Sequence, residues 1–207
     1  MADIKIIGTP ISNYVRAIRM LCEEKGVPYT LEPEMPHTPE VQAIHPAGQV
    51  PCLRHGDVTL FESKAIAHYI ENHCPKPQFF PSDSLKSSLV EQWVSFVNVK
   101  VDRWIMREYV VPSLFFDEET GPDKEKLNAA LPEIEQRLET LDKAVAGTGY
   151  LVGDSLTFAD LNVVPMLVAL TMFPETKEML AKHKNLSAYV DKISARPSFQ
   201  NTAPPEM

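Results

Sequence analysis

Residues 4–32 read IKIIGTPISNYVRAIRMLCEEKGVPYTLE, and this stretch decides the fold. It opens with the short apolar run Ile4–Ile7, which predicts a strand. Apolar residues at helical spacing follow and predict a helix over residues 12–25, which Gly26 ends. The segment PYTLE (28–32) predicts a second strand. A strand, a helix and a strand joined in this way normally form a right-handed parallel pair.

The pattern continues with VPCLRHGDVTLFE (50–62), which predicts a β-hairpin with its turn at Gly56 and Asp57. SKAIAHYIENHC (63–74) then predicts an amphipathic helix. The order is therefore βαβ followed by ββα, which makes residues 1–75 an α/β domain. The proline-rich segment 76–83 predicts a linker.

Residues 84–207 are helical in pattern almost throughout, which predicts a second, all-helical domain. Two long apolar periodicities stand out, over residues 84–111 and 123–146. The predicted fold class is thus α/β plus all-α, in two consecutive domains.

Composition excludes several classes of function. The formal net charge of -8 argues against a broad nucleic-acid or anionic-membrane surface, because phosphate binding needs an excess of Lys and Arg. No apolar run is long enough for a membrane span, and the start MADIKIIG lacks a secretory pattern, so we expect a cytoplasmic protein. Three cysteines without CxxC or zinc spacing predict reduced thiols and no metal site.

Three short segments bear on function, and each has a structural alternative. In HPAGQVPCL (45–53), Pro51 precedes a strand; if the Val50–Pro51 bond is cis, the exposed edge pairs with an extended peptide ligand, and otherwise this is a simple loop. In FESKAI (61–66), Ser63 either caps the next helix or helps that helix N-terminus to hold a ligand carboxylate, while Glu62 receives an ammonium group.

The third segment is GTPISNYVRAI (8–18), in which Ser12 stands where the strand turns into the helix. Ser12 either caps the helix or donates a hydrogen bond to a ligand anion, helped by the positive end of the helix. If that anion is a thiolate, the donation lowers the pKa of the thiol.

In this order, and followed by a helical domain, the three segments make the chain resemble the cytosolic glutathione transferases. The segments resemble most the serine-type phi and theta classes, whose N-terminal domain is thioredoxin-like. GDSLTFADLNVVP (153–165) resembles the family's helix-capping segment, with Thr157 and Asp160 in a capping-box relation. NLSAYVDKISARPSF (185–199) is similar to its last-helix pattern, with Tyr189 where tryptophan is common.

The resemblance implies that Ser12 activates the glutathione sulfur and that Val50, beside a cis Pro51, binds the cysteinyl backbone of the tripeptide. The implied activity is transfer of glutathione, as thiolate, to an apolar electrophile, with peroxidase activity on organic hydroperoxides as a side reaction. Glutathione would be the co-substrate, and no metal is required. The alternative left open is a non-catalytic binding or assembly module of the same fold.

Other positions follow from the same resemblance. Glu62 and Ser63 would hold the γ-glutamyl end, Gln49 would support that region, and His37 matches a position that often carries a lysine near the glycyl carboxylate. Small hydrophobic electrophiles would be the partners, in a pocket that faces the helical domain, and the protein would be a homodimer although Ala47 replaces an aromatic residue of phi-type enzymes. The candidate pocket walls are Trp104, Met106, Arg107, Tyr109, Phe115 and Phe116.

Overall fold

The computed structural model describes residues 3–74 and 76–205. By their contacts, the residues divide into two compact units. The N-terminal unit holds the chain up to Ser84 and, in addition, the chain from Ser194 onward; the helical unit is Leu85–Ile193. The last helix of the chain is thus part of the N-terminal unit, where contacts with α1 hold it.

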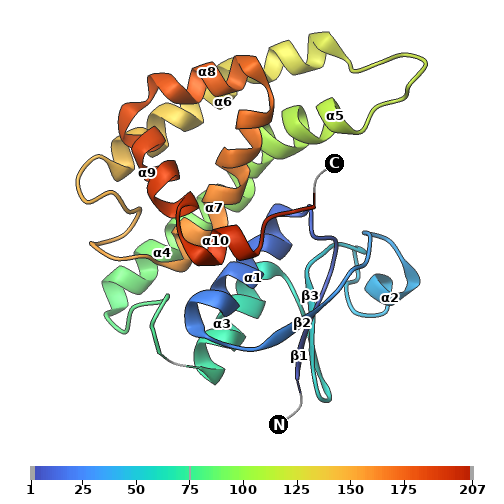
Figure 1. The fold of residues 1–207 in the computed structure, drawn as a ribbon, viewed down its shortest axis with the longest axis vertical. Coiled ribbons are helices and arrows are strands. Elements are labelled where there is room, and N and C mark those ends of the chain that lie inside the picture. Colours follow the sequence, from blue (N-terminus) through green and yellow to red (C-terminus); the bar gives the residue numbers. More distant parts are fainter. Residues whose placement is uncertain (1–2, 75, 206–207) are drawn as a thin grey trace. The chain divides into compact units, whose positions relative to one another are not determined.

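Four strands of the N-terminal unit form one mixed sheet in the order β2-β1-β3-β4 (Figure 1). β1 (Ile4–Ile7) pairs in parallel with β2 (Tyr29–Glu32), which confirms the predicted βαβ unit. β3 (Cys52–His55) runs antiparallel to β1, and it also runs antiparallel to β4 (Val58–Phe61), to which a two-residue turn joins it. The predicted hairpin is therefore confirmed.

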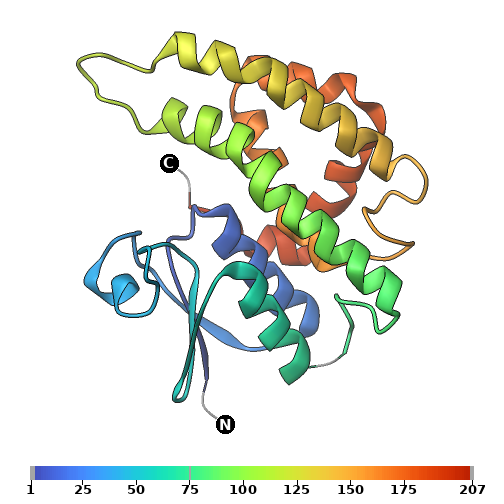
Figure 2. The ribbon, with the colours of Figure 1, turned by 180° about the vertical axis from the view of Figure 1, so that it is seen from behind.

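Helices pack on both faces of this sheet. α1 (Asn13–Lys25) and α3 (Ser63–His73) contact each other and the strands. α2 (Pro39–Gln42) lies on the opposite side of the sheet from them (Figures 1 and 2), and its Val41 forms a buried cluster with Ile7 and Cys52. The βαβ and ββα order predicted from the sequence is confirmed. α10 (Pro197–Asn201) completes the unit by packing on α1.

The helical unit confirms the predicted change to an all-helical pattern. The first predicted helix is continuous in the chain but not α-helical throughout: α4 (Ser84–Phe96) passes into π-helical hydrogen bonding before it returns to α5 (Val111–Leu114). The two π-helical segments are η1 (Val97–Val101) and η2 (Arg103–Val110). The helices that follow α5 are α6 (Lys124–Val145), α7 (Phe158–Ala169), the 3-10 helix η3 (Leu170–Met172), α8 (Pro174–Lys182) and α9 (Lys184–Ser194).

The start of α7 is a capping box, as the sequence predicts. The backbone N–H and the hydroxyl of Thr157 both donate to the Asp160 carboxylate, at 2.8 and 2.9 Å. Asp160 is fully buried and also accepts from the Leu151 N–H and the Tyr189 hydroxyl, each at 2.9 Å. Burial raises the pKa of Asp160, and these four neutral donors oppose that shift.

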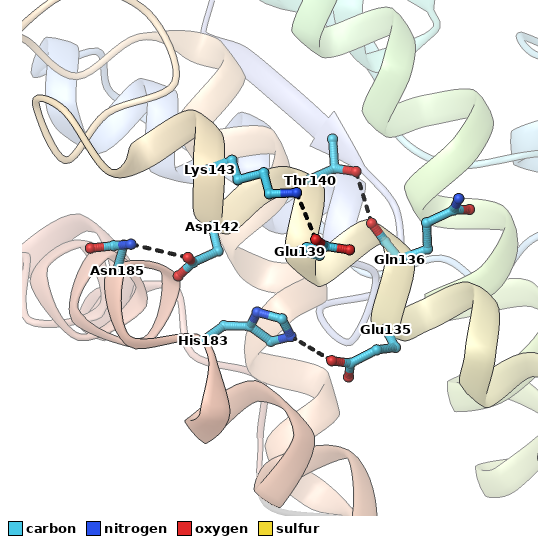
Figure 3. Close-up of polar contacts among 8 residues, drawn as sticks. All are labelled: Glu135, Gln136, Glu139, Thr140, Asp142, Lys143, His183 and Asn185. Carbon is cyan, nitrogen blue, oxygen red and sulfur yellow. Dashed lines mark hydrogen bonds and ion pairs between the residues drawn. The ribbon is translucent and has the colours of Figure 1, made fainter.

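Polar contacts join α6 to the segment where α8 ends and α9 begins (Figure 3). His183 Nε2 lies 3.0 Å from Glu135 Oε1, and the Asn185 side chain donates to Asp142 at 3.0 Å. The Leu186 N–H donates to the same carboxylate at 2.8 Å. The Leu186 bond thus gives a partner to one of the first-turn N–H groups of α9, which lack acceptors inside the helix.

Candidate active site

The three segments singled out in the sequence meet at one end of the sheet. Ile7, the last residue of β1, lies opposite Cys52, the first residue of β3, and Cys52 lies opposite Phe61, the last residue of β4. The chain that follows β1, the chain that precedes β3 and the chain that follows β4 therefore share this end. Residues 8–12, 50–51 and 62–63 are placed together by strand register.

Ser12 is the N-cap of α1, as one of its two predicted roles requires. Its backbone is extended (φ -71°, ψ 125°), and its Oγ accepts a hydrogen bond from the Val15 N–H at 3.4 Å. Within the described residues, the O–H of Ser12 has no acceptor of its own. The side chain is half-buried, so the free donor lies at the positive end of a helix and remains reachable.

Gly8 lets the first two segments approach each other closely. Its φ is +154°, and a Cβ at this position would lie 2.6 Å from Cγ2 of Val15 and 3.0 Å from Cβ of Val50. Such contacts are too short for carbon atoms. Only glycine therefore allows α1 and the segment before β3 to pack on the end of β1.

The Val50–Pro51 peptide bond is cis, so the condition set for the second segment is met. Neither the N–H nor the C=O of Val50 has a hydrogen-bond partner within the described residues, because strand pairing begins only at Cys52. This leaves one donor and one acceptor for an extended peptide ligand. Gln49 is exposed, and its carbonyl accepts a weak bond from the Cys52 thiol at 3.6 Å.

The third segment has an unusual backbone. Glu62 has φ 68° and ψ 117°, a conformation that L residues rarely adopt, and it occupies the N-cap position of α3 without a side-chain cap. Ser63 is the buried first residue of that helix, so the expectation that it caps α3 is wrong. The reason is that the Glu62 carbonyl accepts from the Ile66 N–H at 3.0 Å, so helical hydrogen bonding begins one residue before Ser63.

The carboxylate of Glu62 is 63% exposed and faces the buried His45, whose Nε2 lies 3.7 Å from Glu62 Oε1. The other ring nitrogen of His45 accepts the Ala47 N–H at 3.1 Å. An accepting Nδ1 carries no proton, so the neutral ring holds its proton on Nε2, on the side of Glu62. Sequence reasoning did not predict this contact, because His45 and Glu62 belong to different segments that local patterns do not pair.

His37 lies beside the second segment. The backbone N–H of His37 donates to the Gly48 carbonyl at 2.8 Å, and the φ of His37 is 68°. Gly48 has φ +64°, and a Cβ there would lie 2.5 Å from His37 Nδ1. His37 is exposed, so its ring borders the loop that leads to Val50 and remains accessible.

Cys22 and Cys52, two of the three cysteines of this unit, are not poised for chemistry. Burial raises the pKa of Cys22 to about 12 and that of Cys52 to about 11, so neither is a thiolate at neutral pH. Both thiols are buried in the core of the unit. No group of three or more His, Cys, Asp or Glu side chains in residues 3–74 and 76–205 is arranged to hold a metal ion.

The candidate pocket walls all belong to the helical unit, and they differ in exposure. Met106 and Tyr109 are buried, and the ring of Tyr109 meets that of Phe173 edge to face at 5.4 Å. Burial raises the pKa of Tyr109, with a smaller contribution from Glu175. Trp104 is half-buried, whereas the exposed positions are Arg107, Phe115 and Phe116. The contact with Phe173 was not predicted, because that residue lies beyond the patterns considered.

Comparison with known proteins finds glutathione S-transferases, both among family models and among curated sequences. The family model "Glutathione S-transferase, N-terminal domain" matches residues 6–78, and "Glutathione S-transferase, C-terminal domain" matches residues 106–201. The rice (Oryza sativa subsp. japonica) protein named probable glutathione S-transferase GSTF2 is 30% identical over 216 aligned positions, and the match covers 98% of this chain and 97% of its own.

Solved structures agree with these matches. Poplar glutathione transferase F1 is 26% identical and superposes with a TM-score of 0.87, over 98% of this chain and 97% of its own. Glutathione S-transferase-I bound with lactoylglutathione is 25% identical, with a TM-score of 0.82 over 98% of this chain and 99% of its own. In the part of the chain that the structure describes, no helix is long and apolar enough to cross a membrane.

Proposed function

Because this chain belongs to the glutathione S-transferase family, we propose that it transfers glutathione to apolar electrophiles and that Ser12 activates the sulfur. One observation carries the assignment of Ser12. Its Oγ accepts the Val15 N–H as a helix cap, which leaves its own O–H without an acceptor within the described residues. Cap and activator are thus compatible roles of one hydroxyl.

The energetics favour this role. A free thiol has a pKa of about 8.5, so only about 3% is thiolate at pH 7. A hydrogen bond from Ser12 and the positive end of α1 both favour the charged sulfur. A pKa lowered by about two units would make about three quarters of the bound thiol a thiolate at pH 7.

The remaining contacts would hold the tripeptide. The unpaired N–H and C=O of Val50 would pair with the cysteinyl backbone, and the exposed carboxylate of Glu62 would receive the γ-glutamyl ammonium group. The start of α3 at Ser63 offers N–H groups to the γ-glutamyl carboxylate. Gln49 and His37 border the same loop, where His37 would lie near the glycyl carboxylate.

The proposed reaction is nucleophilic substitution or addition. The thiolate forms a carbon–sulfur bond with the electrophilic carbon, the leaving group departs with its electron pair, and the thiol proton passes to water. Holding both reactants close supplies much of the acceleration. An organic hydroperoxide would be reduced to its alcohol by the same thiolate, with a second glutathione closing the disulfide and water formed.

A cytoplasmic homodimer is part of the proposal. Its structural support is the edge strand β4, on which Val58 and Phe61 are 40% and 39% exposed. Exposed apolar side chains on an unpaired strand edge favour a covering partner. The mass in solution, measured by sedimentation equilibrium, is expected to be twice the chain mass of 23.2 kDa.

The test is the rate at which an activated aryl halide is conjugated to glutathione. Ser12→Ala is expected to lower kcat on the order of a hundredfold, because it removes one donor to the developing charge. Since this change also removes the cap, Ser12→Asp is the matched control: it keeps the cap but has no O–H at pH 7, so it should be stable and inactive. Ser12→Thr keeps both functions and should retain most activity.

Equal rates for the wild type and Ser12→Ala would remove Ser12 from the mechanism. The binding-module alternative is addressed by thermal unfolding with glutathione. A transferase is stabilised by millimolar glutathione, because a ligand that binds only the folded state raises the melting temperature. No rise in the wild type would contradict both transfer and glutathione binding.

A further inference from the structure

Arg16 lies one helical turn beyond Ser12 on α1. Its backbone N–H donates to the Ser12 carbonyl at 2.9 Å, which places the two residues on one face of the helix. Side chains of a helix point back towards its N-terminus, so the stem of Arg16 covers the turn that begins at Ser12. The residue is 7% exposed.

The guanidinium of Arg16 has no carboxylate partner within the described residues. One nitrogen donates to the Phe199 carbonyl at 2.9 Å, and the group stacks on the Phe199 ring with Cζ 3.6 Å from the centroid. Nε is buried and has no acceptor. Burial, and to a smaller extent Arg19, lowers the pKa of Arg16 to about 10, which leaves it charged at pH 7.

A buried charge without a counter-charge is costly, and proteins normally pair such groups. Two other charged residues of α1 are paired in that way: Glu24 receives two hydrogen bonds from Arg196, at 2.6 and 2.7 Å, and Lys25 bonds to Glu71 at 2.8 Å. Arg16 is the exception among these residues. An anion that arrives with a ligand would supply the missing counter-charge.

The position of the guanidinium is fixed by its surroundings. α10 packs on α1 (Figure 1), and the Arg196 and Ser198 side chains both anchor to Glu24. Phe199 is thereby held against α1, so its carbonyl and ring fix Arg16 before any ligand binds. A charge oriented in advance needs no reorganisation when negative charge develops nearby.

We propose that Arg16 is a positioning and electrostatic residue whose fixed positive charge stabilises the glutathione thiolate at Ser12. The inference rests on the proposed function, since glutathione supplies the anion. In a medium of effective dielectric constant about 20, opposite unit charges interact strongly enough to shift a pKa by about one unit out to about 12 Å, which is more than two turns of an α-helix. The effect on the bound thiol is therefore measurable.

The experiment is a titration of glutathione bound to the full chain, followed by the ultraviolet absorbance of the thiolate. Arg16→Gln removes the charge but retains a donor for the Phe199 carbonyl, and it is expected to raise the pKa of the bound thiol by about one unit. Arg16→Lys keeps the charge and is expected to leave that pKa within about 0.3 units of the wild type. Arg16→Met serves as the neutral variant if Arg16→Gln does not fold.

Arg19→Gln is the matched control. Arg19 lies on the same helix, one turn farther from Ser12, and its side chain also donates to the C-terminal segment, at the Thr202 carbonyl. Arg19→Gln removes one positive charge and one hydrogen bond to the C-terminal segment, as Arg16→Gln does. Because Arg19 is farther from Ser12, the pKa of the bound thiol should change much less than in Arg16→Gln. Equal shifts in the Arg16 and Arg19 variants would overturn the assignment to Arg16.

The titration distinguishes failure of the proposed function from failure of the inference on Arg16. If wild-type protein binds glutathione without lowering its thiol pKa below that of the free tripeptide, the proposed function fails and the inference with it. If the wild type lowers that pKa and Arg16→Gln lowers it equally, only the inference is overturned, and Arg16 is then a structural anchor for α10. A purely structural role predicts loss of melting temperature with no change in the bound thiol.

Discussion

Glu71 in the N-terminal unit and Asp160 in the helical unit are both buried carboxylates, but their partners differ. Glu71 bonds to the ammonium group of Lys25 and to two backbone N–H groups, those of Phe79 and Phe80. Asp160 accepts only from neutral donors, two backbone N–H groups and two hydroxyls. Of these two acids, Glu71 is thus held by a cation and Asp160 by neutral donors.

The difference extends to a second acid of the N-terminal unit. Burial alone would raise the pKa of Glu24, but hydrogen bonds from Arg196 and Ser198 hold it below its ordinary value. In Asp160 the neutral donors do not outweigh burial, and the pKa is raised. A cation beside a buried acid therefore reverses the direction in which the pKa of that acid is shifted.

The largest loss of stability is expected from breaking the ion pair between Lys25 and Glu71. The Lys25 side chain is fully buried and also donates to the Pro77 carbonyl at 2.6 Å, so Lys25→Met leaves Glu71 as an uncompensated buried charge. The free energy of unfolding should fall by about 3–5 kcal/mol. Urea denaturation monitored by far-ultraviolet circular dichroism measures it.

The double variant Lys25→Met with Glu71→Leu is the control. Replacing both charges by apolar groups is often neutral, so it should recover most of the lost stability. A double variant as unstable as Lys25→Met alone would mean that the hydrogen bonds to residues 77–80, and not the unpaired charge, set the loss.

A smaller difference in stability is expected between alanine substitutions at two glycines that have the same φ, one in each unit. Gly48 and Gly153 both have φ +64°, but a Cβ at Gly48 would strike His37 whereas Gly153 has no heavy atom within 4 Å. Gly153→Ala should cost only the strained conformation, about 1 kcal/mol. Gly48→Ala should cost about 1 kcal/mol more and weaken glutathione binding, measured by calorimetry. If the two variants lose the same stability and bind glutathione with the same affinity, the loop beside His37 accommodates the added methyl group without cost, which would contradict this prediction.

The smallest effect is a pH dependence of opposite sign in the two units. The lowered pKa of Glu24 gives stability that is present above its unfolded pKa of about 4.3 and lost as the pH falls through the folded value. The raised pKa of Asp160 gives stability that is present below about pH 3.9 and lost as the pH rises through the folded value.

Urea denaturation of Glu24→Gln and Asp160→Asn between pH 6 and pH 3.5 checks this contrast. The penalty of Glu24→Gln relative to the wild type should shrink on acidification, and that of Asp160→Asn should grow. Penalties that change in the same direction would contradict the role assigned to the charged partners.

Local patterns predicted much of this molecule. The order of strands and helices, the parallel β1–β2 pair and the hairpin follow from periodicity and turn residues over short distances. The Thr157–Asp160 capping box was also predictable, because its two members are three residues apart in the chain. These features depend on neighbours in the chain.

Features that depend on distant residues were not predicted. Glu24 and Arg196 are 172 residues apart, and charged residues on an amphipathic helix carry no signal for a partner that far away. The π-helical turns over residues 97–110 were missed because a shift in backbone hydrogen bonding leaves the apolar pattern helical. The positive φ of Glu62 was missed because nothing local demands it.

The central claim is that three segments at one end of the sheet hold glutathione with its sulfur at Ser12. A crystal structure of the chain with glutathione tests it most directly. The account predicts the sulfur within hydrogen-bonding distance of Ser12 Oγ, the cysteinyl backbone paired with Val50 and the γ-glutamyl end at Glu62 and Ser63. Glutathione bound elsewhere, or with its sulfur turned away from Ser12, would contradict the claim.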